Sequence, residues 1–184
     1  MKKSKILKIL KSASENINII NAYFAFDVNY YNLIPLTIND NLFLSINEDD
    51  FIFDGYSIYR LKDLVSVKVK NDLCDKILLE EGFTTNVTIP TIDINSWKSV
   101  FESLALMNKN IIVEKQTIAP KHSKFVIGRI HEIHKKYAYV WNFNANGVWD
   151  DNPTRVPYSE ITNIEFSSRY VETFSKYVDE PPIN

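Results

Sequence analysis

The chain has 184 residues, of which 45% are hydrophobic and 24% are charged, and its formal net charge is −2. This composition allows a packed core and excludes a disordered chain, while the charge excludes the bulk basic excess typical of nucleic-acid-binding proteins. The single cysteine, Cys74, excludes an intrachain disulfide and a multi-cysteine metal site, and we expect it to be a buried structural thiol.

The first predicted element is an amphipathic helix. Apolar residues recur at helical spacing between lysines, which predicts a helix from about Lys3 to Glu15. A basic amphipathic helix also suits a membrane surface, but this one is short and lacks an aromatic anchor, so packing across the end of the first sheet is favoured. The sequence contains neither a signal-peptide pattern nor an apolar run of membrane-spanning length, and we expect a soluble, cytoplasmic protein that does not bind membranes.

Short strands follow, separated by turn-forming residues. We expect strands at Ile17–Phe26, Leu33–Ile38, Asn41–Ile46, Phe51–Phe53, Ser57–Leu61 and Leu64–Val69. The polar stretch from Asn47 to Asp50 and the pair Asp54-Gly55 mark turns between them. A short helix, Leu73–Glu80, is expected to end at Gly82.

A connector with Pro90 inside it runs from Thr84 to Asp93 and leads to a second set of elements. Ser96 is expected to cap a helix at Trp97–Met107. The expected strands are Ile111–Lys115, Phe125–Ile133, Ala138–Phe143, Val148–Trp149, Thr154–Tyr158 and Ile161–Phe166. A closing helix at Ser168–Val178 and a loose tail complete the chain.

The chain repeats its own pattern at a separation of 97 residues. The stretch Tyr158–Phe166 echoes Leu61–Val69, and the same separation continues upstream without a gap, so that Ile130 falls on Leu33. Similarity at a fixed long spacing indicates a duplicated unit. We therefore predict an α+β fold, mainly β with flanking α-helices, made of two repeated small antiparallel barrels, each preceded by an amphipathic helix. The predicted boundaries are 1–83 and 95–178 for the two units, 84–94 for the connector and 179–184 for the tail.

The order of elements resembles the Sm-like (SH3-like) barrel. The better match is Phe125–Ala138, where Gly128 stands at the position of that family's second-strand glycine. The resemblance implies the fold. It does not extend to the family's RNA pocket, because the turn aspartate falls on His134, the asparagine falls on Ala138, and the Arg-Gly pair has no counterpart.

Familiar catalytic and metal-binding patterns are absent from the sequence. His131 and His134 are separated by three residues rather than four and lie on a predicted strand and turn, which does not suit a zinc-protease site. Asn47–Asp50 lacks the alternating ligands and the early glycine of a calcium loop. With four glycines, no phosphate-binding loop is evident. We expect no metal, no cofactor and no catalytic residue.

Aromatic and acidic residues gather on two predicted hairpins. The candidate binding residues are Glu48, Asp49, Asp50, Asp54 and Tyr56 in the first unit and Trp149, Asp150 and Asp151 in the second. Such side chains on protruding hairpins suit docking to a basic protein surface. We predict a non-enzymatic protein-binding module, and one compatible role is an immunity or antitoxin-type inhibitor of a basic toxin or nuclease.

Two alternatives remain open. The first is RNA binding through the second unit, whose local basic and aromatic residues are Lys121, His122, Lys124, Arg129, His134, Lys135, Lys136 and Tyr137. The net charge and the missing pocket residues argue against nucleic acid as the partner. The second is a hydrolase with a site between the units, which requires polar residues converging from both halves.

Asp63 and Glu160, at equivalent positions, are expected to accept backbone N–H bonds in turns.

Overall fold

The computed structural model describes residues 1–182 as a mainly β protein with flanking helices, which confirms the predicted α+β class. The α-helices are α1 (Lys3–Glu15), α2 (Leu73–Glu80), α3 (Trp97–Leu106) and α4 (Arg169–Phe174). The strands of the first half are β1 (Ile20–Phe24), β2 (Tyr30–Ile38), β3 (Leu42–Asp49), β4 (Ile52–Arg60) and β5 (Leu64–Val69). Those of the second half are β6 (Asn110–Lys115), β7 (Lys124–Ile133), β8 (Tyr137–Asn142), β9 (Thr154–Pro157) and β10 (Asn163–Phe166).

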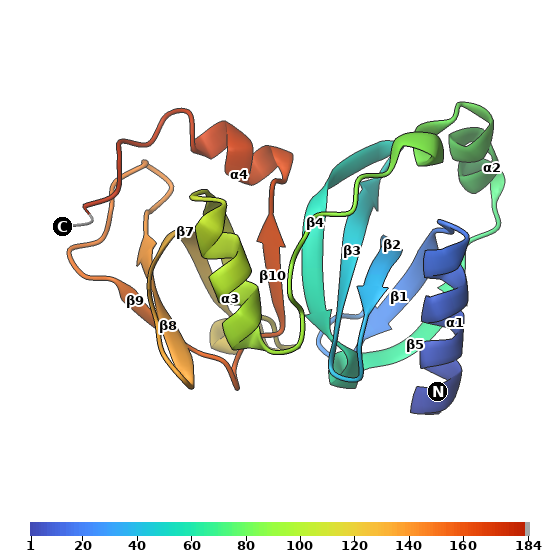
Figure 1. Ribbon diagram of the computed structural model, residues 1–184, viewed down its shortest axis with the longest axis horizontal. Helices are drawn as coiled ribbons and strands as arrows, with labels where there is room; N and C mark the ends of the chain where they lie inside the picture. Colours follow the sequence, from blue (N-terminus) through green and yellow to red (C-terminus); the bar gives the residue numbers. More distant parts are fainter. Residues whose placement is uncertain (183–184) are drawn as a thin grey trace.

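The ten strands form one antiparallel sheet in the order β5-β1-β2-β3-β4-β10-β6-β7-β8-β9. Each half contributes five neighbouring strands, and in both halves the order is fifth, first, second, third, fourth. The halves join in the middle of the sheet, where β4 pairs with β10 and Ile58 lies opposite Ile164 (Figure 1). Helix α1 and the segment that follows α4 lie at opposite ends of the molecule (Figure 1).

The sheet is open, whereas the sequence predicts two closed barrels. The closed barrels are therefore not confirmed. Closure is one way to remove sheet edges, because every strand then has two partners. Here β4 obtains its second partner from the other half, and β5 and β9 are left at the edges. The N-terminal amine of Met1 donates to the carbonyl oxygen of Val65 at 2.8 Å, which satisfies one acceptor of β5.

The strand pairings show that corresponding residues of the two halves are not separated by a constant 97 residues. If Val69 corresponds to Phe166 at that separation, their partners Ile20 and Ile111 correspond at 91. The next partners, Leu33 and Gly128, correspond at 95. Ile130 therefore does not fall on Leu33. The shifts are even numbers, so each residue keeps the face of the sheet that the sequence pattern predicts.

Helix α1 packs against β2 and β5 through its apolar stripe, so it covers these strands and does not lie across the end of the sheet as expected. Ile6, Leu10 and Ala13 are buried against β1 and its neighbours, while the lysines remain outside. The core beneath the helix is aromatic: the rings of Phe24 and Tyr59 stack at 4.7 Å between centroids, and Phe43 stacks on Tyr59 at 5.6 Å.

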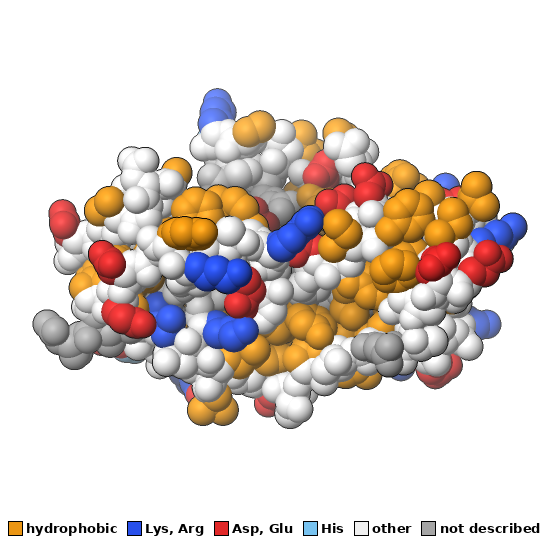
Figure 2. Space-filling view, turned by 90° about the horizontal axis from the view of Figure 1, so that it is seen from above, with side chains coloured by type: hydrophobic (Ala, Val, Ile, Leu, Met, Phe, Trp, Pro, Cys, Tyr) orange, Lys and Arg blue, Asp and Glu red, His pale blue; other side chains and the backbone are white. Residues whose placement is uncertain are grey.

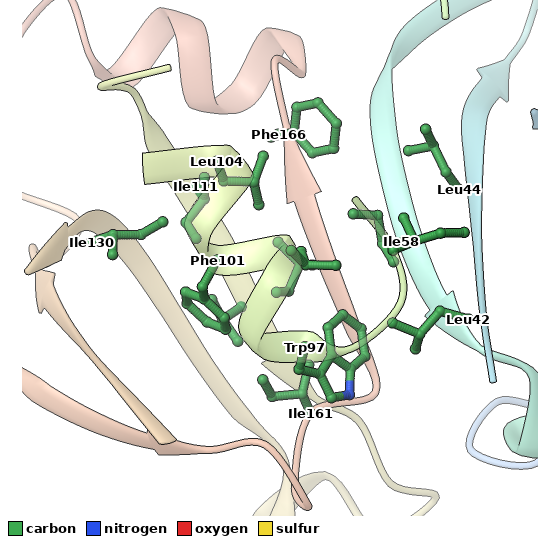
Figure 3. Close-up of a cluster of buried hydrophobic side chains, with 14 of the residues drawn as sticks. Leu42, Leu44, Ile58, Trp97, Phe101, Leu104, Ile111, Ile130, Ile161 and Phe166 are labelled. Carbon is green, nitrogen blue, oxygen red and sulfur yellow. The ribbon is translucent and has the colours of Figure 1, made fainter. Parts of the chain in front are cut away.

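Helix α3 packs on β7 and β8 of the second half, and some of its side chains reach the first half. Ser96 caps it as predicted, accepting from the backbone N–H of Ser99 at 3.1 Å. Figure 3 shows Trp97 and Leu104 of this helix beside residues of the first half and of β10. The residues of this shared core include Leu42, Leu44 and Ile58 from the first half and Ile111, Ile130, Ile161 and Phe166 from the second. The two sets of strands are thus joined by a common hydrophobic core as well as by hydrogen bonds.

Several elements differ from their predicted extents. The turn predicted at Asp54-Gly55 lies inside the single strand β4, where Gly55 adopts φ +68°. The backbone of Ser168 also approaches Gly55, and a Cβ here would be 2.5 Å from the Ser168 nitrogen. The predicted Val148–Trp149 strand is reduced to one bridge between Trp149 and Phe143. Helix α4 ends at Phe174 instead of Val178.

Cys74 is exposed, which contradicts the predicted buried thiol. The reason is that α2 is short and lies on the surface, so that Leu78 is its one buried residue. Among residues 1–182, no helix has the length and apolar character needed to cross a membrane.

Candidate functional site

The hairpin between β3 and β4 presents two of the predicted binding residues to solvent. Asp49 pairs with Ile52 at the end of the ladder, and the two residues between them form a tight turn with positive φ, 43° at Asp50 and 70° at Phe51. Aspartate tolerates this left-handed backbone because its short side chain can bond locally. Asp49 and Asp50 are both exposed at the tip.

Glu48 is not a surface residue, contrary to the expectation from its place in an acidic run. It is 6% exposed, and its carboxylate accepts a hydrogen bond from the buried Lys70 at 3.1 Å and another from the backbone N–H of Phe51 at 3.0 Å. The side chains of a strand alternate between faces, so Glu48 points inward where Asp49 points outward. Its contacts assign Glu48 to the structure of the hairpin.

Asp54 and Tyr56 make contacts within the molecule. Asp54 accepts a hydrogen bond from the backbone N–H of Arg169 at 2.5 Å, in the first turn of α4. The Tyr56 hydroxyl donates to the carbonyl oxygen of Thr88 at 3.0 Å, and its ring stacks on Phe166 at 5.3 Å between centroids. Both residues hold neighbouring segments against β4.

The second predicted group lies elsewhere on the molecule. Trp149 packs edge-on against Phe143, and its indole N–H donates to the carbonyl oxygen of Asp179 at 3.0 Å. Asp150 accepts from the Asn142 amide at 2.9 Å, and Asp151 is exposed. Asp54 is bonded to the first turn of α4, whereas Trp149 is bonded to the chain beyond its last turn, so the structure does not bring the two predicted groups together.

The structure places an exposed apolar surface beside the first hairpin, which the sequence did not indicate. The contact between Lys70 and Glu48 holds the start of α2 near the hairpin, and the ring of Phe83 meets that of Phe53 at 6.3 Å. Five apolar side chains are between 41% and 71% exposed there: Ile52, Leu73, Leu79, Phe83 and Ile89. We call these five residues, together with Asp49 and Asp50, the α2 surface.

Acidic side chains border the α2 surface. Residues 71–83 contain Asp72, Asp75, Glu80 and Glu81 and one cation, Lys76. Partial burial raises the pKa of Asp75, and the neighbouring charge of Asp72 acts in the same direction. Figure 2 looks down on this end of the molecule and shows hydrophobic side chains gathered over its right half, with acidic side chains next to them.

One sequence signal could have indicated that α2 leaves apolar side chains exposed, although not which ones. Five of the eight residues of α2 are apolar or cysteine, namely Leu73, Cys74, Ile77, Leu78 and Leu79. An eight-residue helix on a sheet buries only one stripe, so apolar residues all around it must leave some exposed.

The polar residues that meet between the halves form an internally bonded network. The Glu114 carboxylate accepts from the amides of Asn163 at 2.7 Å and Gln116 at 2.8 Å, and the Tyr31 hydroxyl of the first half bonds Gln116 at 3.2 Å. Burial raises the pKa of the nearby Glu165, with the Ser168 hydroxyl acting in the opposite direction. Glu114 is held as an acceptor by two amide donors, and we interpret the network as a structural feature of the junction.

Many of the basic side chains of the second half are engaged. His134 Nε2 lies 2.9 Å from the Glu132 carboxylate, and Arg129 bonds the side chains of Asn108 and Asn110. The Arg155 guanidinium lies over the Tyr137 ring at 4.1 Å. No cluster of three or more metal-ligating side chains suited to a metal ion occurs within the described part of the chain.

Asp63 and Glu160 accept from cationic side chains, and the predicted side-chain bonds to backbone N–H groups are not found among the described residues. Asp63 bonds Arg60 at 2.6 Å, while Glu160 bonds Lys124 at 2.9 Å and Lys115 at 3.3 Å. These lysines lower the pKa of Glu160. The two positions share a role as ion-pair partners in front of the last strand of each half.

Comparison of this chain with protein-family models, with curated proteins and with solved structures gave no match.

Proposed function

We propose that the protein is a non-enzymatic, cytoplasmic module that binds a partner protein through the α2 surface. The observation that carries the proposal is the group of exposed apolar side chains at α2 and the first hairpin, bordered by acidic residues. Contiguous apolar patches with a polar rim mark protein interaction sites more often than ordinary surface. Because an interface core excludes water, such side chains contribute most to affinity when a partner covers them.

The charge of the rim selects the class of partner. Asp49, Asp50 and the acids of residues 71–83 give this end of the molecule a negative potential. Complementary charge steers association and discourages partners of the same sign. A basic protein therefore suits this surface, and a toxin or nuclease with a basic active site is one such partner. In that role the protein acts as an immunity or antitoxin-type inhibitor.

Capture of partners from a lysate of the organism that encodes the chain tests this proposal. The first variant combines Asp49→Lys with Asp50→Asn; asparagine is chosen at position 50 because it tolerates the positive φ observed there. The second variant is Phe83→Ser, which removes an exposed ring. The matched control is Lys135→Glu with Lys136→Glu, an exposed pair at the far end of the molecule.

The proposal predicts a protein that the native chain and the lysine control retain and that both α2-surface variants lose. Added salt should weaken the capture, because exposed charges are screened. The proposal fails if the lysine control alone loses the captured species, or if that species is RNA. The Arg129 guanidinium is already bonded to Asn108 and Asn110, and the Tyr137 ring is already covered by Arg155, which argues against RNA.

We further propose that the two halves are copies of one Sm-like (SH3-like) unit. Two features support this: the shared strand order, and an irregularity that interrupts the second-to-third strand pairing of both halves at corresponding places, after Pro35 and after Ile130. These residues correspond at the separation of 95 that the registers give for β2. An experimental structure tests the proposal by superposition of residues 1–83 on residues 95–178. The proposal is contradicted if the strands of the two halves are connected in different orders.

A further inference from the structure

The second half contains a cavity that the proposed function does not use. Its volume is about 190 Å³, and it lies between β6, β7, β9 and the turn before β10. Apolar side chains form its wall: Val113, Val126, Val156, Pro157 and Ile161. Four of them, Val113, Val126, Val156 and Ile161, belong to the buried core and are at most 8% exposed, so the hollow reaches into the hydrophobic interior of this half.

The first half shows why this cavity exists. The cross-strand pair Ala138–Val156 corresponds to Phe43–Tyr59 in the first half, and Val126, which pairs with Val113, corresponds to Tyr31, which pairs with Ala22. In the first half the rings of Phe43, Tyr59 and Tyr31 fill the interior together with Phe24. The same places in the second half carry valine and alanine. Val126 and Val156 both line the cavity, so the space that the rings of Tyr31 and Tyr59 fill in the first half is open in the second.

Cationic groups stand at the mouth of the cavity. Lys115 and Lys124 line it, with Glu160 as their anionic neighbour, which leaves a local excess of positive charge; Arg155 also belongs to the lining, but its guanidinium lies over the Tyr137 ring. The carboxylate of Glu114 is turned to the other face of the sheet, where Asn163 and Gln116 bond it. In Lys124 the side chain is 61% exposed, so its ammonium group can reach a ligand without unfolding any strand.

We propose that this cavity binds a small apolar carboxylate, with its ring or short aliphatic chain among the valines and its carboxylate between Lys115 and Lys124. The size is suitable, because an engineered apolar cavity of about 150 Å³ is sufficient to bind benzene. The Glu160 carboxylate already bonds both lysines and so occupies the place that a ligand carboxylate takes. Glu160 therefore acts as an internal competitor and marks the anion position.

Titration of the full chain with benzoate, followed through the methyl resonances of valine and isoleucine, tests this proposal. We expect shifts at Val113, Val126, Val156 and Ile161 and none at Val67 in the first half, where aromatic rings fill the corresponding space. Benzyl alcohol, which has the same ring without the charge, is the matched ligand and should bind at least about tenfold more weakly, since charge-assisted hydrogen bonds are the stronger ones.

Three variants separate the parts of the site. Lys124→Gln should weaken benzoate about tenfold and leave benzyl alcohol unchanged. Glu160→Gln should strengthen benzoate severalfold, because the internal competitor is removed. Val156→Tyr introduces the residue that stands at the corresponding place in the first half, and it should abolish binding of both ligands while the spectrum remains that of a folded protein. If Val156→Tyr does not fold, the two charge variants decide the question.

The proposal is overturned if benzoate causes no methyl shifts in the millimolar range. It is also overturned if benzyl alcohol binds as well as benzoate and Lys124→Gln affects neither, because the cavity then takes apolar molecules without recognising an anion. Weaker benzoate binding in Glu160→Gln contradicts the assignment of Glu160 as a competitor. Capture of a protein partner through the α2 surface is independent of these outcomes, since no residue of that surface lines the cavity.

Discussion

The ammonium group of Lys70 lies 3.1 Å from the carboxylate of Glu48, and the two side chains are 8% and 1% exposed. Lys70 directly follows β5, whereas Glu48 lies near the end of β3, and the sheet order places β1 and β2 between these strands. A contact across two intervening strands requires the first half of the sheet to curve strongly. The ion pair therefore holds the curved form and positions α2 beside the acidic hairpin.

Removal of Lys70 should be costly. Lys70→Ala leaves the Glu48 carboxylate buried without its cation, and loss of one partner of a buried ion pair costs about 3–5 kcal/mol of unfolding free energy. Urea denaturation measures this change. Lys76→Ala, at an exposed lysine in α2, serves as the control and should change the free energy by less than about 0.5 kcal/mol. An equally small effect of Lys70→Ala would contradict the structural role of the pair.

Replacement of Gly128 should disrupt the second half. Gly128 has φ +151°, and a Cβ at this position would lie 1.9 Å from the carbonyl oxygen of Trp141, an atom fixed in the neighbouring strand. Gly128→Ala should therefore lower the unfolding free energy by more than about 3 kcal/mol, beyond the range of ordinary substitutions.

The control for Gly128 is Gly82→Ala. Gly82 also has a positive φ, +73°, but its Cβ would meet only the Thr85 side chain, at 3.7 Å. Backbone strain alone should then cost about 1–2 kcal/mol. Thermal denaturation of both variants measures the difference, and equal losses would show that close approach to Trp141 is not the constraint at Gly128.

The stability of Glu165→Gln should depend on pH. Burial raises the pKa of Glu165 in the folded chain above its ordinary value of 4.5, with the charges of Glu114 and Asp54 acting in the same direction. The unfolded chain thus ionises Glu165 at a lower pH than the folded chain does, and the folded state loses stability as pH rises from 4.5 through the raised pKa. Glu165→Gln removes this loss, so the variant should be more stable than the native chain at pH 7.

The gain should disappear as pH falls below 4.5, where Glu165 is protonated in both states. Urea denaturation at several pH values between 3.5 and 7 measures it. Glu81→Gln, at an exposed carboxylate, provides the control and should show no such pH dependence. If Glu165→Gln is less stable than the native chain at pH 7, the Glu165 carboxylate is stabilised by its contacts and its pKa is not raised by burial.

The elements with a clear period could be predicted from the sequence. The bounds of α1 and α2 agree with the apolar pattern, and Ser96 caps α3, because these features depend on local sequence alone. The pairing of β4 with β10 could not be predicted, since no local pattern determines which edge a strand finds. The separation of 97 residues was wrong for β1, β2 and β3 because even shifts preserve the alternation of apolar residues.

The candidate site was predicted less well than the fold. Asp49 and Asp50 are exposed as expected. Glu48 belongs to the same acidic run, but it is buried because its position in β3 points to the inner face of the sheet. Asp54 bonds the first turn of α4 and Trp149 bonds the chain beyond its last turn, and the position of this helix depends on long-range contacts. The apolar part of the α2 surface required the structure, because the sequence does not show which side of an apolar helix meets the sheet.

Hydrogen exchange of the free chain and of its complex with the captured partner tests the central claim most directly. The account predicts slower amide exchange in residues 49–53 and 73–89 of the complex, which contain the α2 surface, with little change in the loop and hairpin at 121–137. Slower exchange confined to 121–137, with the α2 surface unchanged, would contradict it.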